Sequence, residues 1–155
     1  MIFGETPLDQ AEGAILAHSL KLENGSFKKG RRLSAEDIAA LRRAGRESVI
    51  AARLEPGDVH EDAAAAALAE ALCGEGLSVS AAFTGRCNLI AGERGVLVVE
   101  RERLDALNLV DEALTVATLT PFDSIEPRQM AATVKVIPFA LPGAVLERCL
   151  EIARA

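Results

Sequence analysis

The sequence predicts an α+β protein, built from mixed β-sheets or a small β-barrel-like lobe together with three to four helices. Two observations carry this prediction. Segments with apolar residues at helical spacing and capping residues at their ends alternate with short runs rich in Val, Leu, Ile and Thr. Half of the 155 residues are apolar, which suffices for one compact domain or for two small lobes that share a core.

The amino-terminal part opens with a predicted hairpin. Residues 13–22 are β-prone, and Asn24-Gly25 is typical of a tight turn that leads into a second short strand. Ser34 can then cap a helix together with Asp37 three residues later. Apolar residues recur on one face of this helix until a glycine supplies its carboxy-terminal stop.

A strand and a second helix follow. Residues 47–54 are predicted to be the strand, and residues 56–74 a turn that leads into an Ala-rich helix. Asp58 and Glu61 favour the amino-terminus of this helix, and Gly74 favours its end. The run of five alanines allows a neighbouring element to approach closely.

The carboxy-terminal part is predicted to be rich in strands, with a short helix at residues 101–110 and a final helix that opens at Pro142-Gly143. The strands are expected at residues 77–83, 86–91, 95–100, 112–119 and 130–139. The buried side of the final helix is expected to carry Val145, Leu146, Cys149, Leu150 and Ile152. We therefore expect an α+β lobe of residues 1–76 and a β-rich lobe of residues 77–155, joined without a linker into one compact unit.

Composition excludes several classes of function. The net charge of −6 and the lack of Trp and Tyr argue against a nucleic-acid partner, which needs cations and stacking rings. Three cysteines without a C-x-x-C pair and two histidines give no metal-ligand spacing. No leader and no long apolar stretch are present, so we expect a cytoplasmic protein with no membrane contact.

The stretch FTGRCN, residues 83–88, is the first candidate for ligand binding. Backbone N–H groups at Thr84 and Gly85, the Arg86 guanidinium and the Asn88 amide could contact an anion or a pterin. The same residues also fit a tight turn or bulge with an exposed arginine. Sequence alone leaves both interpretations open.

Cations supply the second group of candidates. Lys28, Lys29, Arg31 and Arg32 lie within five positions and could hold a phosphate or carboxylate. Alternatively they form a solvated hairpin that protects an edge strand. Lys135 is a charge inside an apolar strand, where it faces either a ligand pocket or the solvent.

No catalytic constellation is present in the sequence. It contains no G-x-S-x-G, no P-loop and no G-x-G-x-x-G, and His18 and His60 do not suggest a catalytic pair. His60 is most simply a residue at a helix start. The carboxylates in LEPGDVHED, residues 54–62, lack the alternating pattern of a calcium loop and are better suited to helix capping.

A family resemblance covers roughly residues 5–60. It rests on two stretches, PLDQAEGAILAHSL and FKKGRRLSAEDIAALRRAGRESVIAARLEPGD. The first is similar to the opening segment of the molybdopterin molybdenumtransferase family of the MoeA and gephyrin E-domain type. There a Pro-Leu-Asp-x-Ala-x-Gly motif leads into an Ala-rich strand. The second is similar to the helix and strand that precede the molybdopterin-binding domain of that family.

The second half resembles the amino-terminal region of bacterial proteins that join a molybdopterin-binding domain to a nucleotidyltransferase domain. The resemblance rests on FTGRCNLIAGERGVLVVERERLDALNLVDEALTVATL and RQMAATVKVIPFALP. The Gly-Gly-x-Ser stretch and the acidic residues with which the molybdenumtransferase family holds pterin and molybdate are absent here.

The resemblance implies an accessory domain of molybdenum-cofactor biosynthesis that is not catalytic by itself. The whole protein would be a molybdenum-cofactor transferase, with its catalytic domain downstream or on a partner. The implied ligand is molybdopterin or the molybdenum cofactor. The residues expected to hold it are Thr84, Gly85, Arg86 and Asn88, with charge from Lys29, Arg32 and Lys135. The alternative is a ligand-free structural domain or homodimer that uses the Ala-rich helix of residues 63–71 and exposed strand edges.

Overall fold

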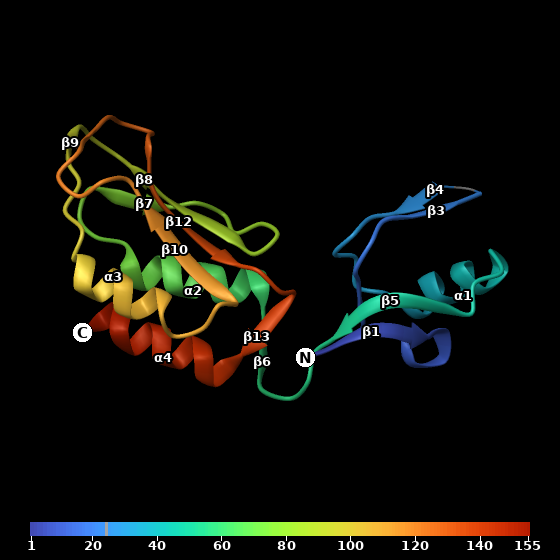
Figure 1. Ribbon diagram of the computed structural model, residues 1–155. Helices are drawn as coiled ribbons and strands as arrows, with labels where there is room; N and C mark the ends of the chain where they lie inside the picture. The colour runs from blue at the N-terminus through green and yellow to red at the C-terminus, as the bar shows by residue number, and fades with distance from the viewer. Residues whose placement is uncertain (24) are drawn as a thin grey trace. The chain divides into compact units, whose positions relative to one another are not determined.

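The computed structural model describes residues 1–23 and 25–155, and these form two compact units, Met1–Pro56 and Gly57–Ala155 (Figure 1). The α+β prediction is confirmed, because both units combine helices with small sheets. All strand pairs of the described residues are antiparallel. No sheet among them closes on itself, so of the two expected forms the structure has the open sheets and not the barrel-like lobe.

The boundary between the two units lies after Pro56 rather than after residue 76. The reason is helix α2 (Glu61–Leu72), which sequence order alone assigned to the preceding lobe. It packs on strands β8 (Arg86–Ala91) and β12 (Met130–Val136) and on helix α4 (Gly143–Arg154). Long-range packing therefore places the Ala-rich helix in the second unit.

The described residues of the first unit form a three-stranded sheet, a hairpin, a short 3-10 helix and one α-helix. The sheet has the order β1-β5-β2, and its core contains Leu16, Leu41 and Val49. The predicted turn residue Asn24 lies outside the described residues, but the strands on either side of it pair as expected. The elements are β1 (Ile2–Pro7), η1 (Leu8–Gln10), β2 (Ile15–Leu16), β3 (Leu20–Leu22), β4 (Gly25–Phe27), α1 (Ala35–Arg43) and β5 (Ser48–Arg53).

Helix α1 begins and ends where local chemistry predicted. The Ser34 side chain accepts a hydrogen bond from the Asp37 N–H at 3.2 Å, and the Asp37 carboxylate accepts one from the Ser34 N–H at 3.2 Å. This reciprocal pair is a capping box. At the other end, Gly45 has a φ of +72°, which a glycine adopts without the strain that other residues incur.

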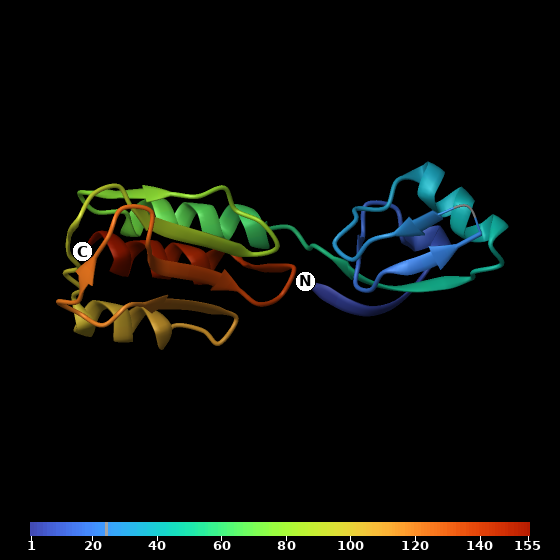
Figure 2. The same cartoon turned by 90° about the horizontal axis from the view of Figure 1, so that it is seen from above.

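The second unit places three helices against one face of a four-stranded sheet of order β10-β12-β8-β7 (Figure 1). Helices α2 and α4 lie side by side in both views (Figure 1, Figure 2). Two further pairs, β6 with β13 and β9 with β11, complete the unit. The elements not yet bounded are β6 (Asp58–His60), β7 (Leu77–Val79), β9 (Gly95–Val96), α3 (Arg101–Asn108), β10 (Leu114–Thr118), β11 (Ser124–Ile125) and β13 (Ala140–Pro142).

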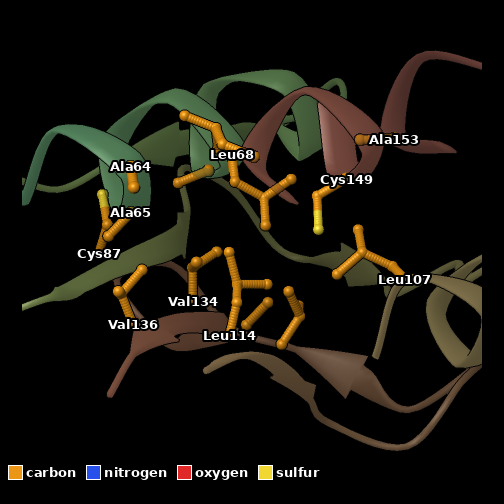
Figure 3. Close-up of a cluster of buried hydrophobic side chains, with 14 of the residues drawn as sticks. Ala64, Ala65, Leu68, Cys87, Leu107, Leu114, Val134, Val136, Cys149 and Ala153 are labelled. Carbon is orange, nitrogen blue, oxygen red and sulfur yellow. The ribbon is translucent and has the colours of Figure 1, made fainter. Parts of the chain in front are cut away.

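The core of the second unit lies between the sheet and the helices. Figure 3 shows Cys87, Val134 and Val136 of the sheet in one cluster with Leu68 of α2 and Cys149 of α4. The residues expected on the buried side of the final helix pack against this cluster, with Leu146 and Cys149 buried and the other three half-buried. The helix begins at Gly143, as Pro142 predicted.

Four strands were not predicted, namely β1, β6, β11 and β13. Strand β1 lies in the opening segment, to which no strand was assigned, and it pairs with β5. Strand β6 lies within the segment interpreted as a turn, and it pairs with β13 just before the final helix. Strand β11 interrupts the loop between β10 and β12 and pairs with β9. Strands β6, β11 and β13 have two or three residues each, too few for a periodic pattern to be visible.

Candidate functional site

The stretch FTGRCN forms a tight hairpin turn. Phe83 and Arg86 exchange two backbone hydrogen bonds, at 2.9 and 3.1 Å. The two residues between them have positive φ angles, +49° at Thr84 and +70° at Gly85. This is the geometry of a two-residue type I′ loop, which favours glycine because it requires the left-handed region twice. The geometry therefore confirms a tight turn at this point of the chain.

Two charged side chains hold this turn in place. The Gly85 N–H donates to the Asp62 carboxylate of α2 at 2.7 Å, and the Lys135 ammonium donates to the Thr84 carbonyl at 2.5 Å. The Gly85 carbonyl accepts from the Val136 N–H at 2.7 Å. The Gly85 N–H is thus already bound to a carboxylate, so an anion at this site has to be recognised by side chains instead.

Gly85 is also required for space. A Cβ built on it would meet the Val136 carbonyl oxygen and would lie 2.6 Å from Oε2 of Glu61. Glu61 is itself buried at the start of α2. The turn is therefore pressed against α2 and β12, and its position determines where the side chains of β8 begin.

Alternation along the strands assigns the remaining candidates to one face. Cys87 and Leu89 of β8, and Val134 of β12, belong to the core beneath the helices. Because neighbouring residues of a strand point to opposite sides, the residues between and beside them point to the face without helices. This free face carries Arg86, Asn88, Thr133 and Lys135.

The register of β8 and β12 pairs these four residues. Arg86 lies opposite Lys135, and Asn88 lies opposite Thr133. The Arg86 guanidinium is exposed and has no hydrogen-bond or ion-pair partner among residues 1–23 and 25–155. Asn88 Oδ1 and Thr133 Oγ1 are both buried, and within the same ranges neither has a hydrogen-bond partner. Two cations thus lie beside two polar atoms whose hydrogen bonding is incomplete.

Thr133 was not among the residues predicted from sequence. A signal for it existed, since Thr133 and Lys135 alternate with valines in ATVKV and therefore share a face. Its pairing with Asn88 was not visible, because that depends on the register between two strands distant in sequence.

Lys29 and Arg32 belong to the first unit, whereas the four residues on β8 and β12 belong to the second. The Lys29 N–H donates to Ser19 Oγ at 3.1 Å, and Arg32 is exposed. Their neighbour Arg31 has a structural role: it donates two hydrogen bonds to Asp37, at 2.9 and 2.8 Å. These hydrogen bonds lower the pKa of the buried Asp37 carboxyl below its usual value.

A separate hollow lies on the helical side of the second unit. Its volume is about 340 Å³, and its lining is mostly apolar, with Leu77, Leu97 and Leu107 among the contributors. Arg103 at this hollow is paired with Glu100 at 2.8 Å. None of the residues predicted to bind a ligand lines it.

The other residues considered for chemistry have structural positions. Nδ1 of His60 accepts from the Asp62 N–H at 3.3 Å, which makes His60 the cap of α2, as predicted. Burial raises the pKa of the Cys87 thiol and of the Cys149 thiol. Throughout the described ranges, no three His, Cys, Asp or Glu side chains gather as a metal site, and no helix has the length and apolar character needed to cross a membrane.

Comparison with known proteins places one match on the first unit. The model of a domain family of unknown function, DUF8806, matches residues 5–53, which lie within Met1–Pro56 and make up less than half of the chain. No curated protein and no solved structure matches the chain. The family match therefore agrees with the limits of the first unit and says nothing of an activity.

Proposed function

We propose that this chain is a molybdopterin-binding or accessory domain of a molybdenum-cofactor biosynthesis protein, and that it positions the pterin for a catalytic domain. The observation that carries the proposal is the free face of the second unit. There Arg86, a cation without a partner among the described residues, lies beside Asn88 and Thr133, whose buried polar atoms lack hydrogen bonds. The family resemblance of the sequence supplies the identity of the ligand.

The residues present suit a phosphorylated pterin. A guanidinium binds a phosphate through two parallel charge-assisted hydrogen bonds, and its charge does not depend on pH in the physiological range. Lys135 adds a second positive charge, although its ammonium also holds the Thr84 carbonyl. The Asn88 amide can pair with the polar edge of a pterin ring. The role of the chain's own residues is to bind and orient the ligand.

The proposal is tested by fluorescence titration of the full chain with a pterin that carries one phosphate ester. We expect saturable binding, and we expect Arg86→Ala to weaken it about tenfold, the loss typical of one charged hydrogen-bonding partner. Arg101→Ala is the matched control, because Arg101 is exposed on α3, within the helical layer. No saturable binding by the wild-type chain, or equal affinity of the Arg86→Ala variant, would refute the proposal.

The alternative is a ligand-free structural or dimerisation domain. The Ala-rich helix offers little surface for dimerisation, because Ala64, Ala65 and Ala69 of α2 are buried within the unit. Strand β1 is a better candidate for a dimer interface than α2. It is an edge strand, and its side chains of Ile2 and Phe3 are 49% and 57% exposed. Light scattering coupled to size exclusion tests this reading: a dimer that persists on dilution and that Phe3→Ser disrupts would support it.

A further inference from the structure

We infer that Asn88 and Thr133 act as a specificity pair that reads the hydrogen-bonding edge of a bound heterocycle, next to the cations that hold its phosphate. The inference rests on the proposed pterin-binding function and adds a residue, Thr133, and a division of roles. Arg86 and Lys135 would provide affinity for the anion. Asn88 and Thr133 would distinguish ligands that have a polar ring edge from those that do not.

The pair is defined by strand register. Asn88 and Thr133 are directly opposite in adjacent antiparallel strands, and such residues have Cβ atoms about 5 Å apart. Asn88 Oδ1 and Thr133 Oγ1 are the two orphaned atoms of this unit among the described residues. Two neighbouring unpaired polar atoms at one place in a sheet are costly, and a functional contact is one explanation for such a cost.

Among the described residues, the neighbours of Asn88 and Thr133 in the same row of the sheet offer no hydrogen-bond partner to these two side-chain atoms. On the β10 side, Thr133 faces Ala117, which has no polar side-chain atom. On the other side, Ser80 already donates its hydroxyl to the Ala81 carbonyl and accepts from the Asn88 N–H. Ser80 satisfies both backbone groups of Asn88, the N–H through its hydroxyl and the carbonyl through its own N–H. The polar side-chain atoms of Asn88 and Thr133 are therefore not needed to hold the strands together.

Chemistry and spacing describe the ligand that fits. An amide oxygen accepts from a ring N–H or an amino group, and a threonine hydroxyl both donates and accepts. Residues that follow each other on one face of a strand are about 7 Å apart, which is the separation between the Asn88–Thr133 row and the Arg86–Lys135 row. Asn88 Oδ1 and Thr133 Oγ1 are buried in the unliganded chain, so a ligand reaches them only when the side chains around them rotate aside. A ligand with a donor-bearing ring edge and an anionic group on its far side then spans both rows.

The test compares two probes on the full chain: the phosphorylated pterin, and inorganic phosphate as its competitor. We expect Thr133→Val and Asn88→Ala each to weaken binding of the pterin about tenfold, while the inhibition constant of phosphate changes less than twofold. Thr133→Val should also raise the unfolding midpoint, because it removes an unpaired hydroxyl and keeps the shape of the side chain. Thr115→Val is the matched control, since Thr115 is exposed opposite Lys135 on the same face, and it should leave pterin affinity unchanged.

The two proposals fail in different ways. If Arg86→Ala weakens pterin binding but Thr133→Val and Asn88→Ala leave it within twofold, the specificity pair is refuted and the binding site stands. If Thr133→Val lowers the unfolding midpoint, the hydroxyl has a structural partner and the pair is likewise refuted. If the wild-type chain binds no pterin at all, both the proposed pterin-binding function and the specificity pair are refuted.

Discussion

Asn108 of α3 closes the outer edge of strand β10 by pairing with both backbone groups of Val116. Its Nδ2 donates to the Val116 carbonyl at 2.9 Å, and its Oδ1 accepts from the Val116 N–H at 2.8 Å. Strand β10 is at the edge of the four-stranded sheet, where outward-pointing N–H and C=O groups can pair with another chain. The side-chain amide takes the place of a neighbouring strand, so at this point the edge is closed to pairing.

Asn108→Ala is expected to lower the free energy of unfolding by about 1–3 kcal/mol, because it leaves the backbone groups of Val116 unpaired. It should also promote concentration-dependent association through the opened edge. Urea unfolding measures the first effect and light scattering the second. Glu102→Ala, an exposed position on the same helix, should do neither. Unchanged stability of the Asn108→Ala variant would mean that water replaces the side-chain amide at no cost.

Gly85→Ala is expected to destabilise the second unit by about 3 kcal/mol, from strain at positive φ together with overpacking. The added Cβ meets the Val136 carbonyl and the Glu61 carboxylate. Gly76→Ala is the matched control: Gly76 has a φ of +74°, but its nearest neighbour is the flexible Glu93 side chain at 3.4 Å. Hydrogen exchange at β8 and β12 should therefore accelerate far more in the first variant. Equal effects would show that backbone strain alone matters at Gly85.

Asp37 is expected to make the first unit sensitive to acid. Its folded pKa is lowered, chiefly by the hydrogen bonds from Arg31. The stabilisation is therefore present above the pKa of the unfolded carboxyl, about 3.9, and is lost as the pH falls through the lowered folded value. Hydrogen exchange within Met1–Pro56, followed from pH 6 downward, should show a loss of protection in the wild-type chain. The Asp37→Asn variant should lack this protection already at neutral pH, because its amide does not ionise.

The same Asp37→Asn substitution should cost about 1 kcal/mol at neutral pH, because it weakens the capping box of α1. It also removes the carboxylate that pairs with the exposed Arg31 guanidinium. Glu36→Gln is the control, since Glu36 is a neighbouring exposed acid in the first turn of α1 and undergoes the same change of charge. If the two variants lose protection equally, the effect comes from the helix dipole rather than from Arg31.

Features that depend on neighbouring residues were visible in the sequence. Ser34 with Asp37 marked the start of α1, Gly45 its end, and Pro142 the start of α4, and the structure confirms each. Capping bonds form within three or four residues and a proline acts on its own backbone, so local sequence carries the information. The strand at 86–91 was likewise evident from its composition.

The candidate site was predicted only in part. Arg86, Asn88 and Lys135 were named from their types, and the structure brings them onto one face of a sheet. Thr133 was missed, and the Gly85 N–H proved to be bound by Asp62. Both facts depend on contacts between segments far apart in the chain, for which no local pattern exists.

The sequence by itself determined the α+β class, the ends of the helices and the alternation of the strands, because hydrogen bonding and side-chain direction within a few residues decide these. Tertiary structure alone decided that α2 joins the second unit, that Asn88 faces Thr133, and that Asn108 closes the edge at Val116. The reason is that burial and strand register are selected by packing over the whole unit. A shift of one residue in β8 would turn its apolar side chains out of the core and break these pairings at once.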